Sequence, residues 1–173
     1  MGNYKEKLHK ITTLIFDYDG VMSDGKVWVI DPETQIRSAH VKDGYALHHA
    51  VKKGFRVAVI SGGKGECIRQ RMAFLGIHDV FLQVPYKRAQ FEAYMTEHGL
   101  QREEVLYMGD DIPDYELMKL AGVSACPADA AHEIREVADY VSHIKGGEGC
   151  VRDIVEQVMR SQNLWFDEAA LHW

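Results

Sequence analysis

Apolar runs alternate with amphipathic segments along most of the chain. Four short runs rich in β-branched and aromatic residues, each bounded by polar residues, predict strands at 11–16, 55–60, 80–82 and 105–108. The segments that follow these runs or separate them carry apolar residues three or four positions apart, which predicts helices at 44–53, 64–75, 87–98 and 113–121. Strands that alternate with helices are typical of a mostly parallel sheet with helices on both faces. We therefore expect a three-layer, Rossmann-like α/β fold.

The last third of the chain continues this pattern with shorter elements. It predicts a strand at 123–126, a helix at 130–138, an edge strand at 140–141 and a final amphipathic helix at 151–162. Glycines mark the helix ends, because Gly54, Gly76 and Gly99 directly follow the first three helices, where a left-handed residue is favoured.

The segment 25–41 interrupts the alternation of strands and helices. Its apolar positions alternate up to a polar turn at 31–34, and an apolar run returns over 36–41, which is typical of an inserted β-hairpin. A hairpin this short cannot form a domain of its own, so its apolar face has to pack on the body or on another subunit. We expect one domain over residues 1–173, with the hairpin insert at about 25–41 and a C-terminal tail at about 163–173.

Composition excludes several classes of protein. The chain has 173 residues, of which 46% are hydrophobic, and this suffices for one well-buried core. Its formal net charge of -6 comes from interspersed acids and bases, without the basic stripe that nucleic-acid binding requires. No apolar run is long enough to span a bilayer, and residues 1–7 lack the hydrophobic segment of a signal peptide. We expect a cytoplasmic protein with no nucleic-acid or membrane partner.

Cysteine and histidine do not form a recognisable metal or disulfide pattern. The three cysteines, Cys67, Cys126 and Cys150, are an odd number at wide spacing, so we expect buried thiols. Among the nine histidines, His48 and His49 are adjacent and diverge on a helix, and no His-x-x-x-His pair occurs. Solvated or core histidines are the favoured interpretation.

Candidate chemistry begins where the first strand ends. Asp17 and Asp19 follow the apolar run directly, at the carboxyl end of a strand, where open α/β sheets bind ligands. Residues two apart on a strand end point to the same side of the backbone, so one acid could attack an electrophile while the other exchanges a proton. Two close anions repel each other, and a divalent cation is the usual remedy. Taken alone, an Asp-x-Asp pair also occurs in ordinary turns.

Two later strand ends offer groups that suit a phosphoryl anion. Ser61, Gly62 and Gly63 place a hydroxyl and flexible amides after the second strand, although a simple turn with Ser61 as a helix cap is the alternative. Lys87 could neutralise the same anion. Its neighbour Arg88 leaves the choice of cation open.

Three acids follow the fourth strand, at Asp110, Asp111 and Asp114. Carboxylates together with water oxygens are the ligands that magnesium prefers, so this density of acids favours a Mg²⁺ site. Helix capping by Asp111 or Asp114 is the alternative.

The order of these motifs resembles the four motifs of the haloacid dehalogenase superfamily of phosphohydrolases, over almost the whole chain. The resemblance implies that Asp17 is the nucleophile and forms an aspartyl-phosphate, and that Asp19 protonates the leaving alcohol and later activates water. It implies that Ser61, with its loop, and Lys87 hold the phosphoryl group. Asp110 would bind Mg²⁺ together with Asp17 and the backbone carbonyl of Asp19. An acid at position 19 favours phosphatases over dehalogenases, which expel a halide without a proton.

The chain also has no room for the cap domain of most superfamily members. It resembles the capless subclass and, through the segments 41–45 and 146–152, the 3-deoxy-D-manno-octulosonate 8-phosphate phosphatases of lipopolysaccharide precursor synthesis. That resemblance implies a homotetramer assembled through the hairpins, in which a neighbouring subunit and its C-terminal tail help to close the site.

The resemblance also bears on the sugar acid phosphate that the site would take. Arg71 is a candidate for the substrate carboxylate, because a guanidinium binds a carboxylate through two parallel hydrogen bonds, but a solvated helix arginine is equally compatible. Lys42 and Gly63 are further substrate-binding candidates. Gly63 favours the eight-carbon acid, because relatives that act on nine-carbon 2-keto sugar acid 9-phosphates tend to carry an acid there. The nine-carbon substrate remains the alternative.

Two further alternatives are proteins that do not catalyse phosphate hydrolysis. A receiver-like phosphoacceptor shares the acids, the hydroxyl and the lysine, but its acidic pair precedes a separate phosphorylated Asp on a middle strand. A non-catalytic oligomerisation module would not need the acids that this chain retains.

Overall fold

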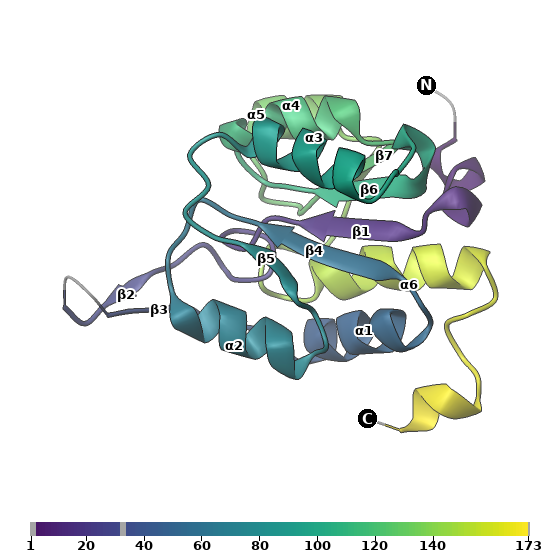
Figure 1. Cartoon of the computed structure of the whole chain (residues 1–173), viewed down its shortest axis with the longest axis horizontal. Helices are drawn as coiled ribbons and strands as arrows, with labels where there is room; N and C mark the ends of the chain where they lie inside the picture. Colours follow the sequence, from purple (N-terminus) through teal and green to yellow (C-terminus); the bar gives the residue numbers. More distant parts are fainter. Residues whose placement is uncertain (1–2, 32–33, 173) are drawn as a thin grey trace.

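The computed structural model describes residues 3–31 and 34–172. A sheet with the strand order β5-β4-β1-β6-β7-β8 runs through its centre (Figure 1), and each neighbouring pair of strands is parallel. Its strands are β1 (Thr13–Phe16), β4 (Arg56–Ile60), β5 (Asp79–Phe81), β6 (Val105–Met108), β7 (Val123–Cys126) and β8 (Tyr140–Val141). Each lies at or close to its predicted position, and the predicted parallel α/β fold is confirmed.

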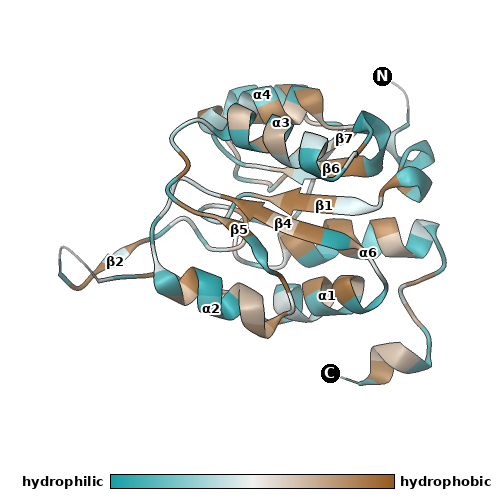
Figure 2. Ribbon diagram, in the orientation of Figure 1, coloured by the Kyte–Doolittle hydropathy of each residue, from teal (hydrophilic) through white to brown (hydrophobic). Residues whose placement is uncertain are grey.

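Helices cover both faces of the sheet (Figure 1). One layer consists of α1 (Val41–Lys52), α2 (Glu66–Phe74) and α6 (Cys150–Ser161), and the other of α3 (Lys87–Glu97), α4 (Tyr115–Leu120) and α5 (His132–Val137). The central strand β1 is fully buried, and its side chains divide between the two layers. Leu14 and Phe16 join the first core cluster and Ile15 joins the second. Burial on both faces explains why the strands are almost continuously apolar (Figure 2).

Short 3₁₀ turns complete the fold. They are η1 (Tyr4–Glu6), η2 (Leu8–Lys10), η3 (Arg102–Glu104), η4 (Ile112–Asp114) and η5 (Glu168–Leu171). The predicted helix 113–121 therefore begins as η4 and continues as α4. The three glycines predicted to end helices, Gly54, Gly76 and Gly99, have the positive φ that the prediction requires.

The insertion after β1 is a small antiparallel ribbon that projects from the body (Figure 1). Its strands β2 (Trp28–Val29) and β3 (Gln35–Ile36) pair with each other and not with the main sheet. Pro32 and Glu33 of the predicted turn lie outside the described residues. The predicted return strand 36–41 was wrong beyond Ile36, because Val41 already begins α1, with Asp43 in its first turn, where an acid favours a helix start. No cap domain occurs in the described residues.

The C-terminal tail folds back onto α1. Trp165 is buried and packs edge-on against the His49 ring, and Arg152 lies over the indole. Trp173, the last residue of the predicted tail, lies outside the described residues. None of the described helices is long and apolar enough to cross a membrane.

The cysteine prediction is correct for two positions and wrong for the third. Cys126 and Cys150 are buried, whereas Cys67 is exposed. The buried stripe of α2 consists of Ile68 and Met72, and Cys67 lies beside this stripe and faces the hairpin.

Candidate active site

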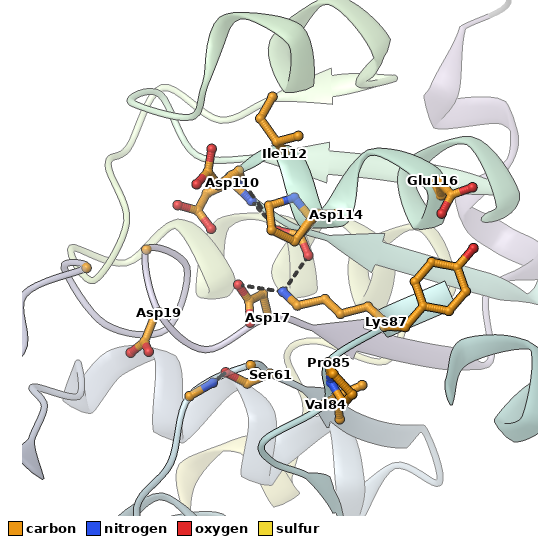
Figure 3. A pocket seen from close by; sticks show the side chains of 17 residues that line it. Asp17, Asp19, Ser61, Val84, Pro85, Lys87, Asp110, Ile112, Asp114 and Glu116 are labelled. Carbon is orange, nitrogen blue, oxygen red and sulfur yellow. Dashed lines mark hydrogen bonds and ion pairs between the residues drawn. The ribbon is translucent and has the colours of Figure 1, made fainter. Parts of the chain in front are cut away.

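The candidate site lies at the carboxyl edge of the sheet. There the register pairs Phe16, the last residue of β1, with Val59 of β4 and Met108 of β6. The loops that follow these strands therefore meet around a cavity of about 540 Å³ (Figure 3). Seven of the predicted site residues line it: Asp17, Asp19, Ser61, Gly62, Gly63, Lys87 and Asp110.

Asp17 is held by a lysine from the core. Lys87, the first residue of α3, is buried, and its Nζ lies 2.9 Å from Asp17 Oδ2 and 2.6 Å from Asp114 Oδ1 (Figure 3). The backbone N–H of Tyr18 donates to Asp17 Oδ1 at 2.7 Å. Burial and the charge of Asp114 raise the pKa of Asp17 to about 7, against the opposing effect of Lys87. Burial lowers the pKa of Lys87, but the two carboxylates outweigh this and raise it overall.

The choice between Lys87 and Arg88 is clear from their positions. Arg88 lies at the surface and forms ion pairs with Glu92 and Glu116. Lys87 is the cation that reaches Asp17.

Asp114 holds several groups of the site in place through hydrogen bonds. It is fully buried, and its carboxylate accepts hydrogen bonds from Lys87 Nζ, from the Tyr107 hydroxyl at 2.6 Å, and from the backbone N–H groups of Asp110 and Asp111. Both oxygens are thus engaged by donors, which makes Asp114 a positioning group rather than an open ligand. Tyr107 was not among the predicted site residues, because its only signal in the sequence is a polar atom on an otherwise apolar strand.

Asp110 provides the clearest evidence for a cation site. Carboxylate oxygens of Asp17, Asp110 and Asp114 lie within 4.8 Å of one another, and the buried Oδ1 of Asp110 has no hydrogen-bond partner among the described residues. Burial, together with the charges of Asp17 and Asp114, raises the pKa of Asp110 to about 8. A buried cluster of this kind is strained as three anions and fits a hard divalent cation, which oxygen ligands prefer.

Gly20 makes this arrangement possible. Its φ is +83°, and a Cβ at this position would lie 2.0 Å from Asp110 Oδ2. Any side chain at position 20 would displace the Asp110 carboxylate.

Asp19 departs from the sequence-based expectation. We expected its side chain on the same side of the backbone as Asp17, but β1 ends at Phe16 and residues 18–23 form a turn closed by hydrogen bonds to Tyr18 O. The Asp19 carboxylate therefore points away from Lys87 (Figure 3). Its Oδ1 accepts a hydrogen bond from Arg37 Nε at 2.6 Å. Arg37 was not among the predicted site residues, because nothing local marks which residue of an insertion turns inward.

The helix-cap alternative for Ser61 is wrong, because α2 begins at Glu66 with Gly65 as its N-cap. Ser61 instead lies in the turn after β4, and its role in phosphate binding stays a prediction. Its buried Oγ accepts a hydrogen bond from the backbone N–H of Gly63 at 3.1 Å, as a turn-capping serine does. Because the oxygen acts as the acceptor there, the hydroxyl hydrogen is available for a group in the cavity.

Two substrate-binding candidates do not line the cavity of this chain. Arg71 places Nη2 beside Gly44 of α1, and its guanidinium also lies over the Phe74 ring. Lys42 is exposed on the first turn of α1. Gly63 does line the cavity.

Comparison with known proteins agrees with this geometry. Residues 76–152 match the haloacid dehalogenase-like hydrolase family. The 3-deoxy-D-manno-octulosonate 8-phosphate phosphatases KdsC of Salmonella typhi and of Escherichia coli K12 are each 34% identical over 163 residues. Each alignment covers 94% of this chain and 86% of the relative.

Solved structures are similar over the same extent. The 3-deoxy-D-manno-octulosonate 8-phosphate phosphatase of Yersinia pestis is 30% identical with a TM-score of 0.90, and the match covers 94% of this chain and 88% of that one. The corresponding phosphatase of Moraxella catarrhalis, in complex with a magnesium ion, a phosphate ion and KDO, is 27% identical with a TM-score of 0.90, over 94% of both chains.

Proposed function

The chain belongs to the 3-deoxy-D-manno-octulosonate 8-phosphate phosphatase family of haloacid dehalogenase-like hydrolases, and from this membership we propose that it hydrolyses that sugar acid phosphate to the free sugar acid and phosphate. The reaction is that of a phosphoric monoester hydrolase in lipopolysaccharide precursor synthesis. The observation that carries the proposal is the single cavity in which Asp17, Asp19, Ser61, Lys87 and Asp110 meet, in a chain related to these phosphatases over 94% of its length.

In the first step, a carboxylate oxygen of Asp17 attacks phosphorus while the bond to the sugar oxygen breaks. Asp19 donates the proton that the leaving sugar alkoxide needs. In the second step Asp19, now ionised, takes a proton from water, which attacks the aspartyl-phosphate and restores the Asp17 carboxylate. Ser61 and the Gly62 amide donate hydrogen bonds to the phosphoryl oxygens, and Lys87 balances their charge.

Mg²⁺ fits the acidic end of the cavity. The carboxylates of Asp17 and Asp110 and the backbone carbonyl of Asp19 would hold it, and the unpartnered Oδ1 of Asp110 supports this choice. When bound, the cation neutralises charge on the phosphoryl oxygens. Asp114 keeps Asp110 and Lys87 in place through its four hydrogen bonds.

The remainder of the substrate extends from the phosphate towards the mouth of the cavity. Gly63 remains our candidate for selectivity towards the eight-carbon acid, although the space beside it is taken by Asp19 and Arg37. Arg71 and Lys42 do not line this chain's cavity, so they would bind a substrate carboxylate only across a subunit boundary or after moving. The exposed apolar side chains of the hairpin, which include Trp28, Val29 and Ile30, support a homotetramer in which a neighbouring subunit closes the site. The free cysteines support a cytoplasmic location.

A phosphate-release assay tests the proposal. Wild-type protein with Mg²⁺ is offered 3-deoxy-D-manno-octulosonate 8-phosphate, a nine-carbon 2-keto sugar acid 9-phosphate and a hexose phosphate. We expect kcat/KM to be highest for the eight-carbon acid. Asp17→Asn should abolish turnover on all three, whereas Glu97→Gln, an equivalent change on the exposed far end of α3, should retain it. Activity that survives Asp17→Asn would refute the mechanism, and a preference for the hexose phosphate would refute the substrate.

A further inference from the structure

Arg37 brings the insertion into contact with the candidate acid. It follows β3 in the stem of the hairpin, yet its side chain is only 4% exposed, in contrast to the exposed Ile36 beside it. Its Nε lies 2.6 Å from Asp19 Oδ1, and its Nη1 donates to the backbone carbonyl of Lys64 at 2.8 Å. The guanidinium therefore ties the loop after β1 to the loop after β4.

The loop after β4 leaves space for this pair. A Cβ on Gly63 would lie 2.7 Å from Asp19 Oδ2 and 3.2 Å from Arg37 Nη2. A side chain at position 63 would thus displace the carboxylate, the guanidinium or both. The glycine at position 63 therefore leaves room for the arginine at position 37, although the two residues are more than twenty positions apart in the sequence.

Arg37 limits the positions that the Asp19 carboxylate can take. Oδ1 is engaged by Arg37 and lies 3.4 Å from the Ser23 hydroxyl, while Oδ2 lies on the side of Gly63, which lines the cavity. Proton transfer needs the donor within hydrogen-bond reach of its target, and a carboxylate free to rotate would meet that condition only part of the time.

We propose that Arg37 is a positioning residue, which holds Asp19 so that Oδ2 delivers the proton to the leaving oxygen. This inference rests on the proposed phosphatase function and deepens it. Arg37 acts through Asp19 and does not touch the phosphoryl group. The hairpin then contributes to the proton-transfer step as well as to assembly.

Leaving groups of different acidity distinguish this role from a structural one. A sugar phosphate must expel an alkoxide and depends on the proton from Asp19, whereas p-nitrophenyl phosphate expels a stable phenolate without it. The ratio kcat/KM depends only on the steps up to and including departure of the leaving group. It therefore reports the role of Asp19 as an acid, separately from its later role as a base. We expect Arg37→Met to lower kcat/KM for the sugar acid phosphate about 10- to 100-fold, and that for p-nitrophenyl phosphate less than about 3-fold.

Three further variants and one matched control complete the design. Asp19→Asn should show the same selective loss with a larger magnitude, and Arg37→Lys should recover part of it. Gly63→Ala perturbs the pair from the other side and should show the selective loss without any change in Arg37 itself. Ser38→Ala, next to Arg37 on the same segment and bonded to Asp24, is the matched control and should leave both substrates unaffected.

Equal losses of Arg37→Met on both substrates, or no loss on either, would overturn the assignment. Arg37→Lys provides the same test, with a smaller selective loss, if Arg37→Met does not fold, which thermal melting would show. Failure of the proposed function looks different: the wild type would be inactive on the sugar phosphate, or Asp17→Asn would remain active.

Discussion

Asp17 and Asp19 are separated by a single residue, but different parts of the molecule hold them. Asp17 is bound by Lys87, which begins a core helix and is itself braced by Asp114. Asp19 is bound by Arg37, which comes from the insertion. The side chains of Asp17 and Asp19 are 9% and 28% exposed, so Asp17 is the more deeply buried of the two acids, although both of the cations that bind them are buried. In the proposed mechanism, the nucleophile is therefore held by the core and the proton donor by the insertion.

This difference allows the position of Asp19 to change without a change at Asp17. Lys87 and Asp114 are part of the packing between the sheet and α3, and any change there affects the fold. The contact between Arg37 and Asp19 joins the turn after β1 to a ribbon that packs outside the main sheet. If the proposed roles hold, an insertion can adjust the position of Asp19 while Asp17 stays in place.

Breaking the core anchor should have the largest effect on stability. Asp114→Ala leaves the buried Tyr107 hydroxyl and the Asp110 N–H without their acceptor, and removes one of the two anions around Lys87. We expect a loss of about 3 kcal/mol in the free energy of unfolding, measured by urea denaturation. Arg37→Met should lower the free energy of unfolding by about 1 kcal/mol. Equal losses for the two variants would erase the distinction between the anchors.

Mg²⁺ should stabilise the core side of the site. At a concentration about 100 times its Kd, the added stability should be about 2.7 kcal/mol, seen as a rise in Tm, and Asp110→Asn should lose most of it. Because the pKa of Asp17 is raised to about 7 and that of Asp110 to about 8, Mg²⁺ must displace protons below these values. Calorimetry should show affinity that strengthens as pH rises through this window. Affinity that is constant over the window would contradict ionisation of this cluster on binding.

Asp43 lies where the insertion returns to the core, and its effect should be smaller. Its Oδ1 accepts the N–H of Arg152 at 2.7 Å, and burial raises its pKa from 3.8 to about 6 against this hydrogen bond. Between these values the folded state keeps a proton that the unfolded chain loses, so stability falls as pH rises through the window. Asp43→Asn cannot ionise. Relative to wild type it should therefore gain about 1 to 3 kcal/mol between pH 4 and pH 7.

The difference in unfolding free energy between Asp43→Asn and wild type should therefore depend on pH. If it stays constant over this pH range, the stability change comes from altered contacts and not from ionisation of Asp43. Urea denaturation at several pH values measures it directly.

The outer face of the hairpin should affect stability least. Trp28→Ser and Ile30→Ser replace side chains that are 68% and 62% exposed, so the unfolding free energy of the monomer should change by less than about 0.5 kcal/mol. Light scattering should nevertheless show a smaller assembly than the wild type. Val141→Ser, which replaces an exposed residue on the edge strand β8, should leave the assembly unchanged. An unchanged mass for the two hairpin variants would exclude the hairpin as the subunit contact.

Local patterns predicted the parts of this protein that depend on neighbours in sequence. The buried strands follow from apolar runs, and Asp17, Ser61 and Asp110 meet because parallel strands place their carboxyl ends along one edge. The return strand after Ile36 was predicted wrongly, because a continuing apolar pattern does not reveal that α1 begins at Val41.

The sequence by itself determined the order of strands and helices and the set of acids, hydroxyl and lysine at the strand ends. Only the tertiary structure decided which partners these groups have. Lys87 rather than Arg88 reaches Asp17, and Arg37 binds Asp19. Both carboxylate oxygens of Asp114 accept hydrogen bonds, from four donors in all. The physical reason is that burial and charge pairing depend on groups brought together from distant segments. Periodicity records which face of an element is buried, but not which partner a buried polar atom meets there.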